Sequence, residues 1–294
     1  MLTYRPHTPA ALLMRPSRPP GGPSPGTTPE PLTVEFTSRV VRAVREIAAA
    51  EILPRFRAVA SRRKDDGSLV TEADLATQRA LAGALAAIEP VALLGEEMPD
   101  AEQRRVWDAG GRFWCVDPLD GTANFSAGVP YFAVSVALMQ GDRPLLGVVV
   151  DPIADEACFA VRGAGAWRDG FALVPPARET ALEAAVAEID LRRALPHVRQ
   201  ELKRRAPYAR RLTSGSSALA WCHLAAGRRD LLLHAGQKVW DYTAGALIAE
   251  EAGVRLATLA EDDFWSAPAW SRSVIAARTP ALFEAWRNWV RQRL

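Results

Sequence analysis

Two aspartates, Asp117 and Asp120, lie three positions apart in the segment WCVDPLDGTANF, and their type and spacing indicate chemistry more clearly than any other residues. Pro118 favours an extended backbone at Asp117, so we expect a buried strand to carry that carboxylate outward and a turn to bring Asp120 back beside it. Two carboxylates held side by side repel each other unless a cation lies between them. Hard divalent cations such as Mg²⁺ take oxygen ligands, usually one or two carboxylates together with phosphate and water. The segment therefore predicts a metal site.

The two residues that follow Asp120 extend this hypothesis to an anionic ligand. Gly121 allows the backbone to approach an anion closely. The N–H groups of Gly121 and Thr122 come at the expected start of a helical turn, where a phosphate oxygen can accept from them. We therefore expect the paired aspartates to hold the metal and the metal to hold a phosphate group.

Three other acidic residues have a structural interpretation beside the functional one. Asp74 follows Thr71 by three positions, as the acid of a capping box does. Asp241 precedes an apolar-periodic helix and would serve as its N-cap. Glu96 would be a surface charge at the end of a strand. Caps and strand ends recruit acids routinely, so spacing alone favours the structural interpretation for all three.

The first half of the chain has the pattern of helices followed by strands, and the predicted hairpins make these strands antiparallel. Apolar residues at helical spacing predict a helix over 34–56, and a polar loop, SRRKDDGS, separates it from a second helix over 71–88. Short apolar runs bounded by turn residues predict strands over 91–97, 112–116, 132–139, 145–150, 158–161 and 166–168.

The second half alternates between strand and helix patterns, which favours a sheet with crossover helices. The expected elements are strands over 184–190 and 230–234, helices over 191–205, 218–226 and 241–252, and a turn over 214–217. Periodicity alone does not decide between strand and helix for the Ala-rich stretch 181–187. The fold class predicted for the whole chain is α+β, with an antiparallel sheet in the first half and a mixed sheet in the second.

The composition argues against several classes of protein. Lys and Arg (36) nearly balance Asp and Glu (34), so a net charge of +2 gives no general attraction to nucleic acid or to an anionic membrane. The longest apolar run, Tyr131–Met139, is much shorter than a membrane-spanning helix needs. Three separated cysteines without CxxC spacing indicate neither disulfides nor a zinc site, and we expect a reducing, cytoplasmic compartment.

The first 33 residues differ in composition from the rest of the chain. They are rich in Pro, Gly, Ser and Thr, and no acidic residue precedes Glu30. Such a segment cannot bury enough apolar surface to order itself, so we expect residues 1–33 to form a disordered tail. A transit peptide is the alternative, and the prolines oppose it because they disfavour an amphipathic helix.

Four motifs, in one order along the chain, make the sequence similar to a known family. They are DGSLVTEAD (66–74), LLGEE (93–97), WCVDPLDGTANF (114–125) and VWDYTAGALIAEEAG (239–253). From about residue 36 to about residue 280 the sequence resembles the inositol monophosphatase family of Mg²⁺-dependent, lithium-sensitive sugar-phosphate phosphatases. The resemblance implies a layered αβαβα sandwich. Residues 34–176 would form an N-terminal α+β subdomain with most metal ligands, and residues 177–294 a C-terminal α/β subdomain that completes the active site.

The resemblance also implies roles for individual residues. The implied metal ligands, for two or three Mg²⁺ ions in each active site, are Glu96, Asp117, the backbone carbonyl of Leu119, Asp120 and Asp241. Asp74 and Thr122 match the catalytic pair that orients and deprotonates the attacking water. Gly121 and Thr122 would bind the phosphate, and no side-chain nucleophile is required.

Substrate contacts match the family less closely than the metal ligands do. In inositol-specific members an acidic residue seven positions before the aspartate of the WD motif contacts substrate hydroxyls, and His234 occupies this place here. Gly215 and Ser216, in the turn SGSS, resemble the substrate-binding turn of the family. The alternatives are a loop histidine without a ligand role and an ordinary serine cap.

The reaction that the resemblance implies is hydrolysis of a small cyclitol or sugar monophosphate, similar to inositol 1-phosphate, by metal-activated water. Activity on 3′(2′),5′-bisphosphate nucleotides, fructose 1,6-bisphosphate or histidinol phosphate is the alternative within this class. The expected partners are a small phosphorylated substrate and a second copy of the chain in a homodimer, with no nucleic acid and no membrane.

A non-enzymatic alternative is a protein-binding module in a regulatory complex, since a bacterial relative has a role in transcription complexes. The residues that would supply its surface form a basic cluster: Lys203, Arg204, Arg205, Arg210 and Arg211. A solvated helix face is the simpler interpretation of this cluster.

Overall fold

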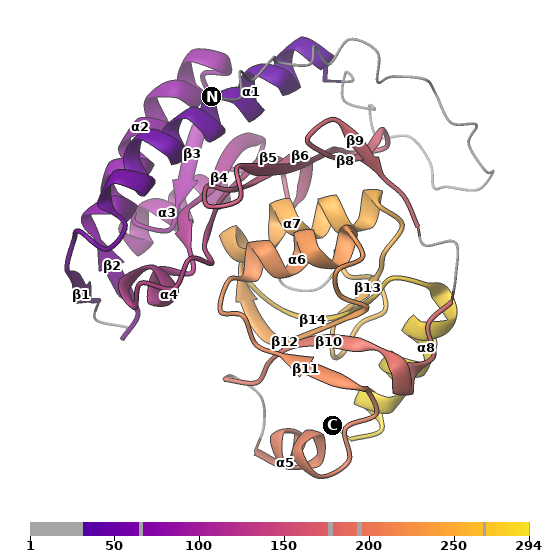
Figure 1. Cartoon of the computed structure of the whole chain (residues 1–294). Helices are drawn as coiled ribbons and strands as arrows, with labels where there is room; N and C mark the ends of the chain where they lie inside the picture. The colour runs from indigo at the N-terminus through magenta and orange to yellow at the C-terminus, as the bar shows by residue number, and fades with distance from the viewer. Residues whose placement is uncertain (1–31, 65–66, 176–178, 193–195, 267–268, 294) are drawn as a thin grey trace, which may run out of the picture.

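Two helices form the outermost layer of the first half in the computed structural model, which describes residues 32–64, 67–175, 179–192, 196–266 and 269–293 (Figure 1). They are α1 (Val34–Ile47) and α2 (Glu72–Ile88), and each begins at a threonine N-cap. Val40 and Val44 of α1 are fully buried in a core shared with the first sheet. The amphipathic pattern read from the sequence therefore marks the face that packs inward.

The segment between α1 and α2 contains a short hairpin that was predicted as a loop. α1 first continues into a π-helical turn (Ala48–Ile52) and a 3₁₀ turn (Leu53–Arg55), so the predicted helix over 34–56 ends in irregular turns. β1 (Ser61–Arg63) then pairs antiparallel with β2 (Leu69–Thr71). The last residue of β2, Thr71, accepts from the Ala73 N–H and so caps α2.

A seven-stranded sheet lies beneath α1 and α2, and its order follows the chain, β3-β4-β5-β6-β7-β8-β9. Its strands are β3 (Ala92–Gly95), β4 (Arg112–Asp120), β5 (Ala133–Gln140), β6 (Arg143–Asp151), β7 (Glu156–Val161), β8 (Gly165–Arg168) and β9 (Phe171–Leu173). Neighbouring pairs are antiparallel except β3 with β4. Helix α3 (Asp100–Ala109), which was not predicted, accounts for this exception, because a parallel pair needs a crossover connection.

Helices α6 (Ser217–Ala225) and α7 (Val239–Glu251) form the central layer, between the first and the second sheet (Figure 1). Tyr242 of α7 is fully buried in a core that includes residues of both sheets. Glycine in β6 permits a close approach, because a Cβ at Gly147 would lie 2.6 Å from the Ala244 carbonyl oxygen. This packing brings the WD motif of the second half against the first sheet.

The second sheet has five strands in the order β11-β10-β12-β14-β13 and is mixed, as predicted. Its strands are β10 (Val186–Asp190), β11 (Arg210–Leu212), β12 (Leu231–Lys238), β13 (Arg255–Ala257) and β14 (Ser271–Ala277). β10 pairs parallel with β11 and β12, whereas β14 pairs antiparallel with β12 and β13. A 3₁₀ turn (Leu182–Ala184) precedes β10, so the Ala-rich stretch is a turn followed by a strand.

Helices α5 (Pro196–Arg204) and α8 (Pro280–Arg291) cover the outer face of the second sheet (Figure 1). Leu202 of α5 and Trp286 of α8 share a buried core with strand residues of that sheet. α5 begins at Pro196, a residue favoured in the first helical turn, and Leu191 lies outside it, contrary to the predicted helix over 191–205. α8 was not predicted. The layers complete the αβαβα sandwich expected from the family resemblance, and the predicted α+β class is confirmed.

None of the helices in the described part of the chain has the length and hydropathy needed to cross a bilayer. The predicted tail over 1–33 falls outside the described residues up to residue 31. The predicted boundary between residues 176 and 177 lies within 176–178, which are also outside them. The tail and the two subdomains therefore stay predictions.

Candidate metal centre

A bulge in β4 brings Asp117 and Asp120 to the same side of the first sheet. Asp117 pairs with Ser135 of β5 and Asp120 pairs with Ala133, so three steps along β4 correspond to two steps along β5. Residues three apart on a regular strand point to opposite faces, and the one extra residue reverses the second of them. The prediction that a turn returns Asp120 beside Asp117 was wrong. β4 continues through Asp120, and the bulge aligns the two carboxylates.

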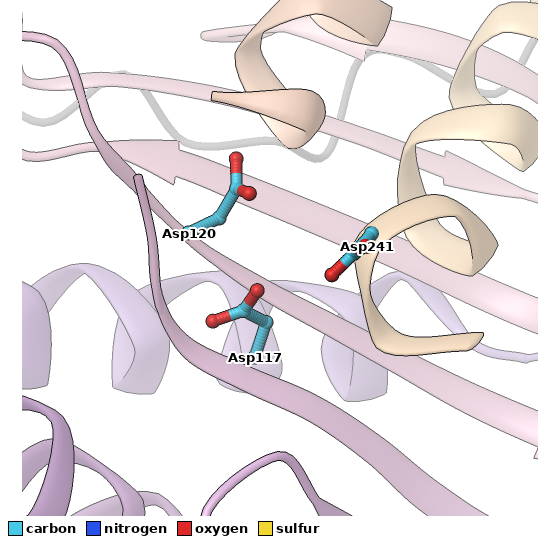
Figure 2. Close-up of side chains that lie close together, drawn as sticks. All are labelled: Asp117, Asp120 and Asp241. Carbon is cyan, nitrogen blue, oxygen red and sulfur yellow. The ribbon is translucent and has the colours of Figure 1, made fainter. Parts of the chain in front are cut away.

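Asp241 completes a group of three carboxylates (Figure 2). One carboxylate oxygen of each of Asp117, Asp120 and Asp241 lies within 4.8 Å of the other two. Asp241 stands at the third position of α7, not at the N-cap where it was predicted, and its Oδ2 accepts from the Lys238 N–H at 2.9 Å. The same carboxylate therefore satisfies the start of the helix and belongs to the cluster.

The three carboxylates repel one another in a buried setting. Burial raises the pKa of Asp117 well above its ordinary value, and the charges of Glu96, Asp120 and Asp241 raise it further. Burial also raises the pKa of Asp120, although hydrogen bonds from the start of α6 oppose this rise. A divalent cation would remove the repulsion, and an all-oxygen ligand set is the kind that Mg²⁺ takes. The residues present therefore fit the predicted cation.

Glu96 adjoins this group at the end of β3. Its charge raises the pKa of Asp117, so the two carboxylates lie within electrostatic range, but Glu96 is not one of the three mutually close carboxylates. Lys64 Nζ lies 3.1 Å from Glu96 Oε1 and 2.6 Å from Glu97 Oε1. Burial raises the pKa of Glu97 to about 7, although the hydrogen bond from Lys64 lowers it. Sequence reasoning missed Lys64 and Glu97, and the second acid of the LLGEE motif was the only signal for either.

Asp74 and Thr122, the predicted catalytic pair, are in contact. Thr122 Oγ1 lies 3.1 Å from Asp74 Oδ1 and 3.0 Å from the Leu119 carbonyl oxygen, so two acceptors share one hydroxyl proton. Asp74 Oδ2 accepts from the Thr71 N–H at 2.7 Å and from its hydroxyl at 2.6 Å. The capping box and the contact with Thr122 therefore use different oxygens of one carboxylate. Burial raises the pKa of Asp74, and the hydrogen bonds from Thr71 and Thr122 limit this rise.

The turn that follows the aspartates joins the two halves of the chain. Gly121 has a φ of +97°, and a Cβ there would lie 3.2 Å from the Tyr131 carbonyl oxygen, so the position needs glycine. The short helix α4 (Thr122–Ser126) begins here, as predicted. Asn124 Nδ2 donates to the carbonyl oxygens of Tyr131 and Ser214, each at 2.8 Å. Asn124, which sequence reasoning missed, thereby connects the start of α4, directly after Asp120, to the SGSS turn.

The SGSS turn contacts a predicted metal ligand directly. The Ser216 hydroxyl donates to Asp120 Oδ2, and the Ala218 N–H donates to the same oxygen at 2.7 Å. Ser216 is also the N-cap of α6, so the predicted serine cap is confirmed. Gly215 has a φ of +83°, and a Cβ there would lie 2.9 Å from Asn124 Nδ2. The turn therefore lies against the cluster.

His234 lies beside this turn in a pocket on the side of the second sheet. Residues from β10, β12 and the start of α6 line it, and those that carry polar groups include Glu188, Asp190, Arg192, Ser216, His234 and Gln237. Ser216 contacts both the pocket and Asp120, so the pocket adjoins the cluster. Sequence reasoning missed Asp190, Arg192 and Gln237, because no motif marks them. The parallel pairing of β10 with β12 makes Asp190 the cross-strand partner of His234.

The chain is similar to known proteins along most of its length. A model of the inositol monophosphatase family matches residues 33–292. A Pseudomonas aeruginosa protein named Nus factor SuhB is 34% identical over 225 residues, which cover 73% of this chain and 81% of that protein. The inositol-1-monophosphatase of Bacillus subtilis is 30% identical over 176 residues, which cover 58% of this chain and 65% of that protein.

Solved structures show the same layered fold. The extragenic suppressor protein suhB of Bartonella henselae has a TM-score of 0.75 at 24% identity, covering 88% of this chain and 100% of that one. The IMPase of Thermotoga maritima has a TM-score of 0.74 at 24% identity, covering 88% of this chain and 99% of that one. At this identity the likeness concerns the fold alone.

Proposed function

Because the chain belongs to the inositol monophosphatase family of metal-dependent phosphatases, we propose that it is a Mg²⁺-dependent phosphomonoesterase acting on a small cyclitol or sugar monophosphate. The observation that supports this best is the convergence of Asp117, Asp120 and Asp241 next to the Asp74–Thr122 pair. Three like charges in a partly buried group are costly unless a cation is bound among them. The ligands for two or three ions in this proposal are Glu96, Asp117, the Leu119 carbonyl, Asp120 and Asp241.

Bound Mg²⁺ would lower the pKa of water and neutralise charge on the phosphate. The chain supplies the base. The attacking water gives its proton to the Thr122 hydroxyl oxygen, and the Thr122 hydroxyl gives its own proton to Asp74 Oδ1. The raised pKa of Asp74 favours proton uptake, because a base acts best when its pKa lies nearer the working pH. The N–H groups of Gly121 and Thr122 hold a phosphate oxygen in place.

We expect purified protein with Mg²⁺ to release phosphate from at least one ester of a panel. The panel contains inositol 1-phosphate, fructose 1,6-bisphosphate, adenosine 3′,5′-bisphosphate and histidinol phosphate. A chelator should abolish turnover and added Mg²⁺ should restore it. The carboxylates are negatively charged, so only a bound cation can neutralise the charge of the phosphate at this site. Asp241→Asn, assayed beside it, should lose most of the activity. Turnover that survives both chelation and this substitution would contradict the proposal.

A second candidate function is a protein-binding module in a regulatory complex. Its support is the name Nus factor SuhB of the P. aeruginosa relative and a basic surface on α5 and β11. Arg204, Arg205, Arg210 and Arg211 are exposed, and none of them forms an ion pair with another described residue. Under this reading, reversing the charges of Arg204 and Arg205 abolishes a cellular phenotype that Asp117→Asn leaves intact. The opposite pattern would reject it.

Two finer expectations stay proposals. We propose a homodimer on the family resemblance alone, and sedimentation of the purified chain at micromolar concentration measures its mass. A cytoplasmic location is proposed from the three cysteines, which are buried and free in the structure. A thiol titration of freshly isolated, denatured protein that found fewer than three free thiols would oppose it.

A further inference from the structure

A residue with a buried, unpaired hydrogen-bond donor lines the pocket beside the carboxylate cluster. Gln237 of β12 is fully buried and lines this pocket. Its Oε1 accepts from the indole N–H of Trp221 at 3.1 Å. An indole nitrogen can only donate, so this contact fixes the orientation of the amide. Nε2 then has no hydrogen-bond partner among the described residues, which is costly for a buried donor unless a ligand accepts from it.

Asp190, a carboxylate in the same pocket, is already engaged. Its Oδ1 accepts from the Arg192 N–H at 2.8 Å, and its Oδ2 accepts from Arg192 Nε at 2.8 Å and from Nη2 at 2.6 Å. His234 Nε2 lies 3.6 Å from the same Oδ2. A carboxylate offers about four acceptor positions, so Asp190 has little capacity left for substrate hydroxyls.

His234 has its one acceptor engaged, and Glu188 has about half of its acceptor positions engaged. His234 Nδ1 accepts from the Gly236 N–H at 3.1 Å, so the ring proton of a neutral imidazole lies on Nε2, facing Asp190. Glu188 Oε1 accepts from the Ser214 N–H at 2.6 Å, and Oε2 lies 3.3 Å from a guanidinium nitrogen of Arg229. Among the polar groups that line the pocket, the Gln237 amide therefore stands out as a buried donor with no partner among the described residues.

Arg192 brings a positive charge to this donor-rich pocket. Its side chain is 71% exposed, so the guanidinium edge that does not contact Asp190 faces solvent. The hydrogen bond with Asp190, and then the charges of Asp190, Asp120 and Asp241, raise the pKa of Arg192. The guanidinium therefore lies within electrostatic range of the cluster, and Asp190 is the residue that positions it.

We propose that the preferred substrates carry a second anionic group, a phosphate or a carboxylate, which Arg192 and Gln237 bind while the scissile phosphate occupies the metal site. This inference rests on the proposed phosphomonoesterase function. An acid at the position of His234, which the resemblance assigns to inositol-specific members, would accept from substrate hydroxyls and repel a second anion. Here an imidazole replaces it, and Arg192 and the unpaired amide donor of Gln237 belong to residues that line the same pocket. A phosphate or carboxylate group can accept from both the Arg192 guanidinium and the Gln237 amide. A polyol hydroxyl can also accept a hydrogen bond, but it carries no charge to pair with the guanidinium.

Matched pairs of esters test this inference. Fructose 1,6-bisphosphate against fructose 1-phosphate, and adenosine 3′,5′-bisphosphate against adenosine 3′-phosphate, probe a second phosphate. 3-Phosphoglycerate against glycerol 3-phosphate probes a carboxylate. In at least one pair, kcat/KM with Mg²⁺ should be about tenfold higher for the doubly anionic ester, mainly through a lower KM, because hydrogen bonds to charged groups contribute about this much.

Two variants and one control assign the effect to the named residues. Arg192→Met keeps the aliphatic stem and should lower kcat/KM for the favoured ester about tenfold, with little change for its singly charged partner. Gln237→Glu keeps an acceptor for the Trp221 N–H and should act in the same direction, because it replaces the donor by an acceptor. Arg210→Met, an exposed arginine of β11, should change neither ester.

The outcomes separate this inference from the function on which it rests. Equal kcat/KM within every pair, or an equal loss for both partners in Arg192→Met, would overturn the inference and leave the proposed function standing. If no ester is hydrolysed, the proposed function fails. The inference about a second anionic group is then tested by calorimetric Kd values of the same pairs, with Ca²⁺ in place of Mg²⁺. Tighter binding of a doubly anionic ester that Arg192→Met removes would support the inference, and equal Kd values would overturn it.

Discussion

Asp117→Asn should lower phosphatase turnover by on the order of 10³, because it removes a charge whose interaction with bound cations contributes several kcal/mol to the transition state. Asp117 is close to both Asp120 and Asp241, and the charge of Glu96 raises its pKa, so it interacts with all the predicted carboxylate ligands. Asparagine has nearly the same shape and keeps an acceptor for the Leu119 N–H, which Asp117 Oδ1 binds at 3.0 Å. The fold should persist. Initial rates at saturating Mg²⁺ on the best ester of the panel measure the loss.

The same substitution should stabilise the protein when Mg²⁺ is chelated. Burial raises the pKa of Asp117, and a group with a raised pKa in the folded state loses its stabilising contribution as the pH rises through that pKa. Burial raises the pKa of Glu97 to about 7, with the same sign. Asp190 has a lowered pKa. Its contribution to the free energy of unfolding is therefore complete above the ordinary pKa of an aspartate, and it adds no pH dependence in this range.

In chelator, the free energy of unfolding of the unchanged protein should therefore fall as the pH rises from the ordinary carboxyl range to about 7. Asp117→Asn should flatten this fall and raise the Tm most at the upper end. Thermal unfolding followed by circular dichroism, with and without Mg²⁺, measures both effects. Asp108→Asn, on the exposed face of α3, removes a charge away from the cluster and is the control. Loss of less than tenfold in activity, or a lower Tm in chelator, would reject the role given to Asp117.

Local chemistry predicted only part of the site from the sequence, whereas the metal ligands other than Asp117 and Asp120 and the Asp74–Thr122 pair were implied by the family resemblance. The spacing from Thr71 indicated the capping box of Asp74, whereas Asp241 stands at the third position of α7 and not at the N-cap predicted for it. Gly121 and Gly215 mark turns with positive φ. The bulge in β4 could not be predicted from the sequence. It is a property of the pairing with β5 and does not show in the apolar and polar pattern of β4 alone.

The missed elements have different physical causes. α3 is mostly polar, and only Gln103 and Val106 are buried, so its apolar periodicity is weak. α8 buries Leu282, Phe283 and Trp286 at helical spacing, and a pattern search could have found it. The pocket beside the cluster was also not predicted, for a third reason. Asp190 and His234 meet through the parallel pairing of strands far apart in the chain, which no local pattern reports.

Asp74→Asn should lower kcat by about 10² to 10⁴ and leave KM and the affinity for Mg²⁺ nearly unchanged, because it removes a base and no predicted metal ligand. The asparagine carbonyl can still accept from the Thr71 N–H, so the start of α2 should persist. Thr122→Val removes the hydroxyl that lies 3.1 Å from Asp74 Oδ1. If the two residues act as one unit, the double variant should be no slower than the slower single variant, since such effects are strongly non-additive.

The pH dependence of kcat separates a base from a helix cap. A base works only when deprotonated, so kcat of the unchanged enzyme should fall on the acidic side with an apparent pKa above that of an ordinary carboxyl, since burial raises the pKa of Asp74. This acidic limb should disappear in Asp74→Asn. Glu72→Gln, an exposed acid in the same helical turn, should keep both the limb and kcat. If Asp74 only caps α2, Asp74→Asn should instead leave both the limb and kcat in place, and that result would remove Asp74 from the mechanism.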